Sequence, residues 1–241
     1  MEDPEFDPEA DIIDLELYRS GGNCFSESEL AVLGDLTDKR VLVTPEGSAE
    51  ETLSFINLGA DVTVLGEDFD VLRSACQELD LAPQMIQGGL ASRLPDELEP
   101  ESFDIVYSPW GSLDGVDEFS DWAVDVATLL KQFGRLIVFD EHPVSFMVKP
   151  ADGQLTVATS YWGEFVDDDS DGEPDSDPPT TFGWAIGDLV TALGNAGVAT
   201  LKLEEFEESG RYLSGLELFE EVDDEIRSRL PSALLLVAVK L

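Results

Sequence analysis

From residue 39 onward, the sequence alternates between short apolar runs rich in β-branched residues and amphipathic segments. Arg40–Thr44 has the character of a strand, Ala49–Leu58 has apolar residues at helical spacing, and Asp61–Leu65 is a second strand. A strand, a helix and a strand in succession form a parallel unit, because the helix carries the chain back to the starting edge of the sheet. This alternation restricts the chain to an α/β fold, with a parallel sheet that carries helices on both faces.

The alternation continues to the end of the chain. The further expected elements are a helix at Phe69–Leu79, strands at Pro83–Ile86 and Phe103–Ser108, a helix at Phe119–Leu130, a strand at Arg135–Asp140, a helix at Phe182–Ala196, a strand at Thr200–Phe206, an acidic helix at Leu216–Leu230 and a last strand at Ser232–Lys240. A chain of 241 residues that is 43% hydrophobic can bury a substantial core, so we expect one α/β domain over residues 39–241.

Two acidic segments lie outside this pattern. Residues 1–16 hold eight acids and two prolines and predict a solvated arm, after which Glu27–Leu36 predicts a short helix, so residues 1–38 precede the domain proper. Residues 164–179 hold eight acids, three prolines and no basic residue. We expect this second segment to be an exposed loop inserted into the domain.

The charge of the chain excludes some partners. There are 53 acidic residues against 13 basic ones, a formal net charge of −40, and the acids are spread along the whole sequence. Such a field repels nucleic-acid phosphates and anionic membranes, and it destabilises a compact state unless salt screens it. We interpret the chain as a halophilic protein adapted to high intracellular salt; an acidic mesophilic protein with a basic partner is the alternative.

The cysteines and the apolar runs bear on location. Cys24 and Cys76 belong to no CxxC motif or Cys/His cluster, and the N-terminus has no signal-like combination of basic and apolar segments. The longest apolar run, Ala233–Val239, is far shorter than the roughly 20 residues that a bilayer requires. We therefore expect a soluble cytoplasmic protein with reduced thiols.

Three stretches of the sequence resemble class I S-adenosylmethionine (SAM)-dependent methyltransferases. They are KRVLVTPEGSAEETLSFINLGADVTVLGED at 39–68, ESFDIVYSPWGSL at 101–113 and ATLLKQFGRLIVFDEHP at 127–143. The last two are similar to the family's "FDVVYS" strand and its "LLKPGGRLIV" approach to the fifth strand. The resemblance implies a Rossmann-like, doubly wound, mostly parallel seven-stranded sheet whose last strand is antiparallel, with SAM as the cofactor.

The resemblance places the first cofactor motif after the first strand, where the family has an acid followed by a G-x-G-x-G turn. Here the acid is replaced by Val43, the first glycine by Pro45 and the last by Ala49, so only Gly47 remains. Proline fixes φ and removes an N–H donor, and alanine adds a Cβ where the cofactor approaches the backbone. Glu46 and Gly47 are the expected cofactor contacts, although Gly47 could serve only the strand-to-helix turn.

Further cofactor contacts are implied at the next strand ends. The acid that accepts the ribose hydroxyls aligns with Gly66, and Glu67 follows one residue later; near the third strand the family's Gly-Asp becomes Gly88 and Gly89, and Ser108 ends the fourth strand. Salt adaptation does not explain missing acids in a chain this acidic. We therefore predict weakened or lost SAM binding, with Glu67 as either a displaced ribose ligand or a solvated surface acid.

The acceptor chemistry is expected beside the fourth and fifth strands. Glu141 and His142, the only histidine, follow the fifth strand, and His142 could take a proton from the acceptor with its pKa raised by neighbouring carboxylates. The alternative is a loop histidine bonded to Asp140 or a backbone carbonyl. Trp110 could cover a flat or cationic acceptor, or pack beneath the following helix.

One metal-like pattern is rejected. Asp167–Gly172 matches the opening of a calcium loop, but the twelfth position is Pro178 in place of the bidentate glutamate that such a loop requires. We expect no specific metal site.

Two functions stay open at this stage. The first is methyl transfer from SAM to a small-molecule or macromolecular acceptor. The second is an inactive pseudo-methyltransferase that acts as a regulatory or scaffolding subunit with a protein partner. A nicotinamide-dependent oxidoreductase is excluded, because no G-x-G-x-x-G follows the first strand.

Overall fold

The computed structural model describes residues 13–44, 49–91, 93–114, 116–162, 184–212, 214–216, 219 and 222–241. The helices are α1 (Leu15–Arg19), α2 (Glu27–Leu33), α3 (Ala49–Asn57), α4 (Asp70–Leu79), α5 (Phe119–Leu129), the short 3-10 helix η1 (Ser145–Met147), α6 (Ile186–Asn195) and α7 (Asp224–Arg227). The strands are β1 (Arg40–Val43), β2 (Asp61–Gly66), β3 (Gln84–Gln87), β4 (Phe103–Ser108), β5 (Leu130–Glu141), β6 (Val148–Ala151), β7 (Gln154–Val157), β8 (Val198–Phe206) and β9 (Ala233–Lys240).

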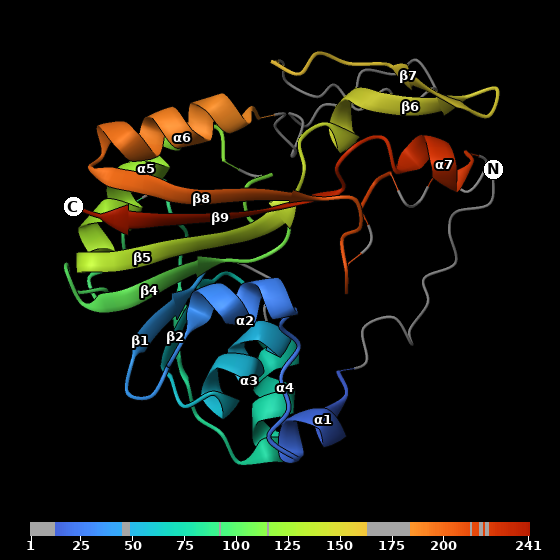
Figure 1. The fold of residues 1–241 in the computed structure, drawn as a ribbon. Coiled ribbons are helices and arrows are strands. Elements are labelled where there is room, and N and C mark those ends of the chain that lie inside the picture. The colour runs from blue at the N-terminus through green and yellow to red at the C-terminus, as the bar shows by residue number, and fades with distance from the viewer. Residues whose placement is uncertain are drawn as a thin grey trace, which may run out of the picture.

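The main sheet has seven strands in the order β3-β2-β1-β4-β5-β9-β8 (Figure 1). β1 pairs in parallel with both β2 and β4, so the chain leaves the centre of the sheet in one direction and later returns to extend it in the other. β9 lies between β5 and β8 and is antiparallel to both. The predicted fold class, a doubly wound sheet with an antiparallel last strand, is confirmed.

Helices cover both faces of this sheet, which explains why its central strands are apolar on both sides. α1 to α4 pack on one face over Val41, Val43 and Tyr107. α5 and α6 pack on the other face over Leu42 and Val106. Figure 1 shows the two helical layers below and above the sheet, so the sheet edges are the surfaces left for a ligand.

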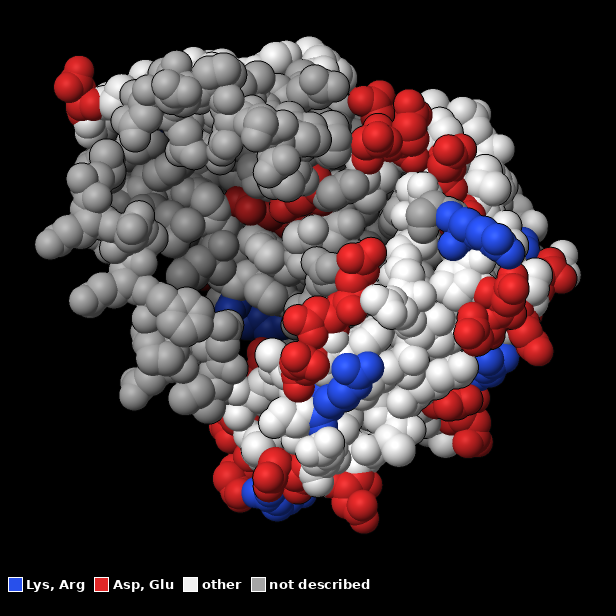
Figure 2. Space-filling view, turned by 180° about the vertical axis from the view of Figure 1, so that it is seen from behind, with Lys and Arg blue, Asp and Glu red and all other residues white. Residues whose placement is uncertain are grey.

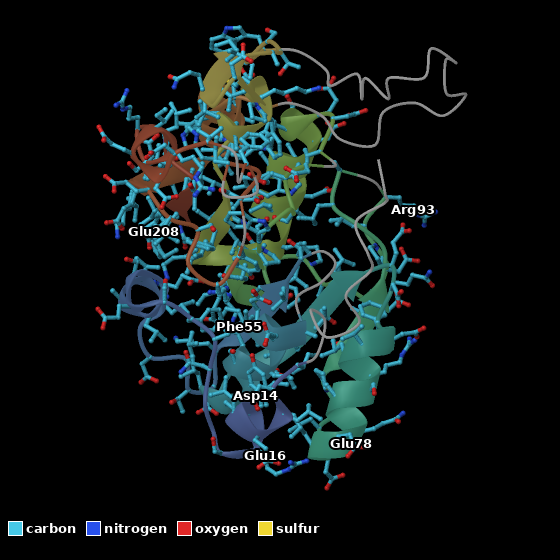
Figure 3. The ribbon with its side chains drawn as sticks, turned by 90° about the vertical axis from the view of Figure 1, so that its right-hand side faces the viewer. Asp14, Glu16, Phe55, Glu78, Arg93 and Glu208 are labelled. Carbon is cyan, nitrogen blue, oxygen red and sulfur yellow. The ribbon has the colours of Figure 1, made fainter. Side chains whose placement is uncertain are left out.

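The N-terminal segment joins the core earlier than expected. α1 begins at Leu15, inside the predicted arm, and Tyr18 is buried; residues 1–12 lie outside the described part. Asn57 at the end of α3 donates hydrogen bonds to the carbonyl oxygens of Tyr18 and Gly22, at 2.9 and 2.8 Å. Figure 3 shows Asp14 and Glu16 at the same end of the molecule as Glu78 of α4, with Phe55 in the interior.

β5 starts five residues before the predicted Arg135, because a turn is inserted into its first part. Leu130 pairs with Phe103, and the next pair along the ladder is Arg135 with Ile105. Gly134 is required in this turn, since a Cβ on it would lie 2.9 Å from the Lys131 carbonyl oxygen.

The predicted acidic helix at Leu216–Leu230 is wrong. Among the described residues of this range, only Asp224–Arg227 is helical, while Leu216 and Val222 are buried in non-helical backbone. The sequence Glu220–Glu225 places like charges three and four residues apart, which destabilises a helix. The helical spacing of apolar residues in this segment therefore marks buried side chains, but it does not mark a helix.

The sequence did not reveal the hairpin of β6 and β7, which pair in antiparallel fashion. Figure 1 places it beyond the carboxyl ends of the strands, near α7. The predicted acidic insertion 164–179 and the calcium-like residues 167–178 lie outside the described part.

Two surface observations complete the description. None of the helices in the described ranges has the length and apolar character that a bilayer crossing needs. Figure 2 shows acidic side chains spread over the described part of one face, with a few isolated basic ones among them.

Candidate functional site

The site expected for this topology lies at the carboxyl edge of the sheet. β1 and β4 are neighbours, yet their connections run to opposite faces of the sheet. Ligands of open parallel sheets bind beyond the carboxyl ends of two such strands, and we call this place the crevice. Among the described residues, Gly66, Ser108 and Glu141 end β2, β4 and β5, and the other predicted site residues, Glu67, Gly89, Trp110 and His142, follow β2, β3, β4 and β5. The topology thus brings their backbone positions to one edge.

The end of β2 lies one residue later than predicted. β2 includes Gly66, which pairs with Gln87 of β3 and accepts a hydrogen bond from the N–H of Gly88 at 3.0 Å. Glu67 is therefore the first residue after the strand, and it is exposed. A carboxylate at this place is a suitable acceptor for a ribose diol.

The end of β3 requires glycine. Gly88 has φ +146°, and a Cβ on it would lie 2.9 Å from Cγ of Pro95. Gly89, the expected counterpart of the family's acid, follows directly after it. Pro95 therefore leaves no space for a side chain at position 88, and Gly89 brings no carboxylate to this strand end.

The first cofactor loop connects β1 to α3. Glu46 and Gly47 lie outside the described residues, together with Pro45. On either side, Val43 is fully buried in the sheet, and α3 begins at Ala49 as predicted.

Asp140 fixes the loop that follows β4. Its Oδ1 accepts the N–H of Gly111 at 2.6 Å, and its Oδ2 accepts the N–H of Leu113 at 3.1 Å. Ser108, at the end of β4, lies 2.5 Å from the hydroxyl of Ser112. Burial, together with the nearby Asp114, raises the pKa of Asp140 well above its ordinary value. The loop that carries Trp110 is therefore held to the end of β5 through a buried carboxyl.

A buried charged group lies above the first turn of α3, and we call it the Arg211 cluster: Arg211, Glu29, Glu51, Tyr107 and Tyr212. Arg211 donates to Glu29 at 2.8 and 3.1 Å and to Glu51 at 2.9 Å. Tyr107 at the end of β4 donates to Glu29 at 2.7 Å, and Tyr212 donates to Glu51. One guanidinium thus joins α2, α3 and the segment after β8.

The two carboxyls of this cluster differ electrostatically. Burial raises the pKa of Glu29, but the hydrogen bond and charge of Arg211 lower it by more, so the net shift is downward. Burial also raises the pKa of Glu51, and there Arg211 offsets only part of the effect, so the net shift is upward. Glu29 is therefore the ionic partner of Arg211, while Glu51 favours its neutral form more strongly.

Aromatic rings surround the guanidinium. Cζ of Arg211 lies 4.6 Å from the ring centroid of Tyr212, 5.6 Å from that of Phe139 and 5.7 Å from that of Phe25. Trp110 stacks on Tyr212 with a centroid distance of 4.9 Å and an interplanar angle of 14°. Trp110 therefore faces the crevice side of the sheet and does not pack beneath α5. The acidic and aromatic side chains of the cluster thus form a cation-binding site, a cation box, and the guanidinium of Arg211 occupies it.

Both ring nitrogens of His142 have partners. Nδ1 accepts the N–H of Val144 at 3.1 Å, and Nε2 lies 2.9 Å from Oε1 of Glu205 on β8. Burial lowers the pKa of His142, and Glu205 offsets this only in part, so the predicted upward shift is wrong. A proton-transfer role for His142 requires one of these two bonds to open.

Glu141, the other predicted catalytic residue, is also buried. Its Oε1 accepts the N–H of Gly215 at 2.5 Å. Glu141 therefore helps hold the segment that carries Arg211 and Tyr212 against the end of β5.

Sequence reasoning identified the strand ends but missed the Arg211 cluster. Arg211, Glu29 and Tyr212 lie in segments that carry no family motif, and Glu51 was one acid among many. The available signal was weak: Glu51 falls beside Leu53 and Phe55 in a helix whose first turn faces the sheet. Only the fold brings the five residues together.

The sequence matches no protein-family model and no curated protein. Solved structures do share its fold. An S-adenosylmethionine-dependent methyltransferase from Mesorhizobium loti has 19% identity and a TM-score of 0.65, with 88% of this chain and 95% of that one covered. A putative one from Listeria monocytogenes has 21% identity and a TM-score of 0.63, with 94% and 99% covered. Geranyl diphosphate C-methyltransferase from Streptomyces coelicolor has 11% identity and a TM-score of 0.57, with 89% and 78% covered.

These similarities extend over nearly the whole of the chain and of the first two structures. They agree with the strand order, the antiparallel β9 and the switch point between β1 and β4. The resemblance noted in the sequence is therefore confirmed at the level of architecture: this chain has the fold of the class I SAM-dependent methyltransferases.

Proposed function

We propose that the protein binds SAM at the carboxyl edge of the sheet and transfers its methyl group to a small-molecule acceptor. Bound SAM supplies an electrophilic methyl group on a sulfonium. The chain would hold the ribose through Glu67, the methionine part through the loop containing Glu46 and Gly47, and the adenine side through Gly66, Gly89 and Ser108.

The observation that carries this proposal is the position of Glu67. Because β2 includes Gly66, Glu67 is the first residue beyond the strand and exposes its carboxylate where the ribose-binding acid is expected. This position supports Glu67 as the replacement for the acid that is missing at Gly66 and as the acceptor of the ribose hydroxyls.

The segment after β8, which carries Arg211 and Tyr212, supports a small acceptor. Arg211 and Tyr212 bind the segment after β8 to Glu29 of α2 and to Glu51 of α3, and a segment held in this way favours a small acceptor over a macromolecule. Trp110, stacked on Tyr212, would line the acceptor side. The Streptomyces coelicolor structure holds geranyl diphosphate, a small molecule, in a fold of this kind. His142 and Glu141 remain the proposed proton-handling residues, subject to movement of Glu205.

Calorimetric titration with SAM in 2 M KCl tests the proposal. The wild type should bind, and Glu67→Ala should bind about tenfold to a hundredfold more weakly, since a hydrogen bond to a charged acceptor contributes about 1.5–3 kcal/mol. Glu78→Ala removes an exposed acid at the other end of the molecule (Figure 3) and is the matched control. Turnover is then measured as S-adenosylhomocysteine release with a panel of small amine, hydroxyl and carbon acceptors.

The inactive pseudo-methyltransferase is the second candidate, and the Arg211 cluster favours it. The chain's own guanidinium fills the cation box beside the crevice, with its charge balanced by Glu29. If this candidate is right, wild type shows no SAM binding, and Gly66→Asp gains it. Binding that collapses in Glu67→Ala would instead contradict it.

A further inference from the structure

A small cavity opens at the opposite, amino edge of the sheet, and we call it the amino-edge cavity. Its volume is about 150 Å³. The turn at the start of β5 forms much of its wall, and Lys39, just before β1, and Asp104 of β4 complete it. In Figure 1 this edge lies at the left, where β5 begins and β9 ends at the C-terminus. It is remote from the carboxyl-edge crevice.

The charge of this cavity is opposite to that of the molecule. Three cationic side chains line it, Lys39, Lys131 and Arg135, against one carboxylate, Asp104. In a chain of 13 basic and 53 acidic residues, three positive charges beside one negative charge form a rare net positive site. Such a site attracts anions locally even though the whole molecule repels them.

Hydrogen bonds and ion pairs within the protein hold the cationic side chains in place, and they leave N–H donors of the two lysines available. Asp104 accepts from Lys131 Nζ at 2.6 Å and lies 3.9 Å from Lys39 Nζ. Arg135 donates to the carbonyl oxygens of Val32 and Leu33 at the end of α2. Each lysine ammonium has three donors, and both lysine side chains remain 40% or more exposed, so donors are available to a ligand.

Phe133 on the turn has two unfavourable features at once. Its φ is +64°, a left-handed conformation that bulky residues rarely adopt, and 70% of its surface is exposed. The "LLKPGGRLIV" motif that this stretch resembles has glycine at the position of Phe133. Backbone strain of this kind clusters at ligand sites. Because Phe133 also lines the cavity, its exposed ring can contact a ligand bound there.

We propose that the amino-edge cavity binds the phosphate group of a small aryl phosphate, whose ring lies on Phe133. The cavity is too small for a whole nucleotide cofactor, since pockets for ligands of that size span roughly 300–1,000 Å³. A phosphate carries about −1.5 to −2 charges at neutral pH, which matches the net charge of the lining. The aromatic part would stay at the rim.

Calorimetric titration of the wild type with phenyl phosphate, inorganic phosphate and benzyl alcohol tests this proposal. The experiment is done in 1 M KCl, where the long-range field of the protein is screened within about 3 Å and contacts inside the cavity persist. Phenyl phosphate should bind up to about tenfold more tightly than inorganic phosphate, because of the ring contact. Benzyl alcohol should not bind detectably. Equal affinities for the two phosphates, or none, would overturn the proposal.

Two substitutions separate the roles. Lys131→Gln should weaken both phosphates about tenfold or more, because it removes a charge-assisted hydrogen bond. Phe133→Gly should weaken phenyl phosphate alone, while it raises the melting temperature by relieving the positive φ. Lys149→Gln on β6 is the matched control and should change neither affinity. A Phe133→Gly variant that binds phenyl phosphate as the wild type does would refute the assigned role of the ring.

Discussion

Arg211 is the residue on which most side-chain interactions above the sheet converge. It is one guanidinium shared by two buried carboxyls, and the two do not contribute equally. Glu29 has the lowered pKa and accepts from Arg211 and Tyr107, whereas the pKa of Glu51 is raised by burial. Removing one partner of a buried ion pair lowers the free energy of unfolding strongly. The loss is smaller when the removed carboxyl already favours its neutral form.

The first prediction compares the two carboxyls. At pH 7 in 2 M KCl, Glu29→Gln should lower the free energy of unfolding by about 3 kcal/mol, because it removes the buried carboxylate whose charge Arg211 stabilises more. Glu51→Gln should lower it by less, because burial already disfavours the charged form of Glu51 and Glu29 still balances the charge of Arg211. Urea unfolding measures both. Equal losses in the two variants would contradict the assignment.

The second prediction concerns Asp114, in the loop after β4. Burial, and then the charge of Glu141, raise its pKa from 3.8 to about 7, and its Oδ1 has no hydrogen-bond partner within the described residues. The folded state therefore holds this proton more tightly than the unfolded state. The resulting stability is present below about pH 4 and is lost as the pH rises through about 7.

Asp114→Asn removes that dependence, because the amide stays neutral. The variant should match the wild type near pH 4 and exceed its free energy of unfolding by up to about 4 kcal/mol at pH 8, since one pKa unit corresponds to about 1.4 kcal/mol. Urea titrations at pH 4, 6 and 8 in 2 M KCl measure the difference. Parallel curves for the two proteins would show that Asp114 is not the titrating group.

At the scale of single residues, the sequence motifs indicated where site residues lie on the strands, but they did not indicate which side chains surround them. The resemblance placed Gly66, Ser108 and His142 at strand ends, where the structure has them. It did not reveal that Glu205 from a distant strand contacts His142, or that burial would outweigh that contact in setting the pKa. Such effects depend on neighbours that only the tertiary fold supplies.

At the scale of elements, the strand ends and their connecting loops set the geometry of the crevice. In its described part, the loop after β4 contains only turns, and the carboxyl of Asp140 accepts the backbone N–H groups of Gly111 and Leu113. The position of Trp110 therefore depends on a side chain at the end of β5.

The third prediction tests this attachment. Asp140→Ala should cost about 2–4 kcal/mol of stability, because it leaves buried N–H donors without acceptors. The amides of Gly111 and Leu113 should exchange with deuterium much faster, while those of the central strands should change only in proportion to the lost stability. Ser112→Ala removes the contacts of its hydroxyl with Ser108 and Asp140 but leaves both N–H bonds to Asp140 in place, and it is the control. Unchanged exchange at Gly111 and Leu113 would rule out the attachment.

Helices and strands whose apolar residues follow one regular spacing could be predicted from the sequence. Those in which an inserted turn or charge repulsion interrupts that spacing could not. β1, α3 and β4 begin within one residue of their expected positions. β5 was predicted too short, because the turn with Phe133 at positive φ interrupts its pattern. The Leu216–Leu230 segment has helical spacing of its apolar residues, but repulsion among its acids outweighs that pattern over most of the described part.

At the scale of the whole molecule, several of the few basic residues make structural contacts. Arg211 is buried in the cluster above α3, Arg135 donates to the end of α2, and Lys131 neutralises Asp104. The remaining surface carries a large excess of negative charge, which Figure 2 shows across one face. Charges at these internal contacts are thus balanced, whereas the carboxylates on the exterior repel one another.

The last prediction follows from that distribution. The net charge is −40, and surface carboxylates within about 10 Å repel one another at 0.1 M salt, whereas at 1 M the screening length falls to about 3 Å. Raising KCl from 0.1 to 2 M should therefore raise the melting temperature by ten degrees or more, on the order of several kcal/mol of stability. Equimolar sucrose, which carries no charge, should give a smaller rise. An unchanged melting temperature in KCl would refute adaptation to high salt and favour a basic partner as the source of neutralising charge.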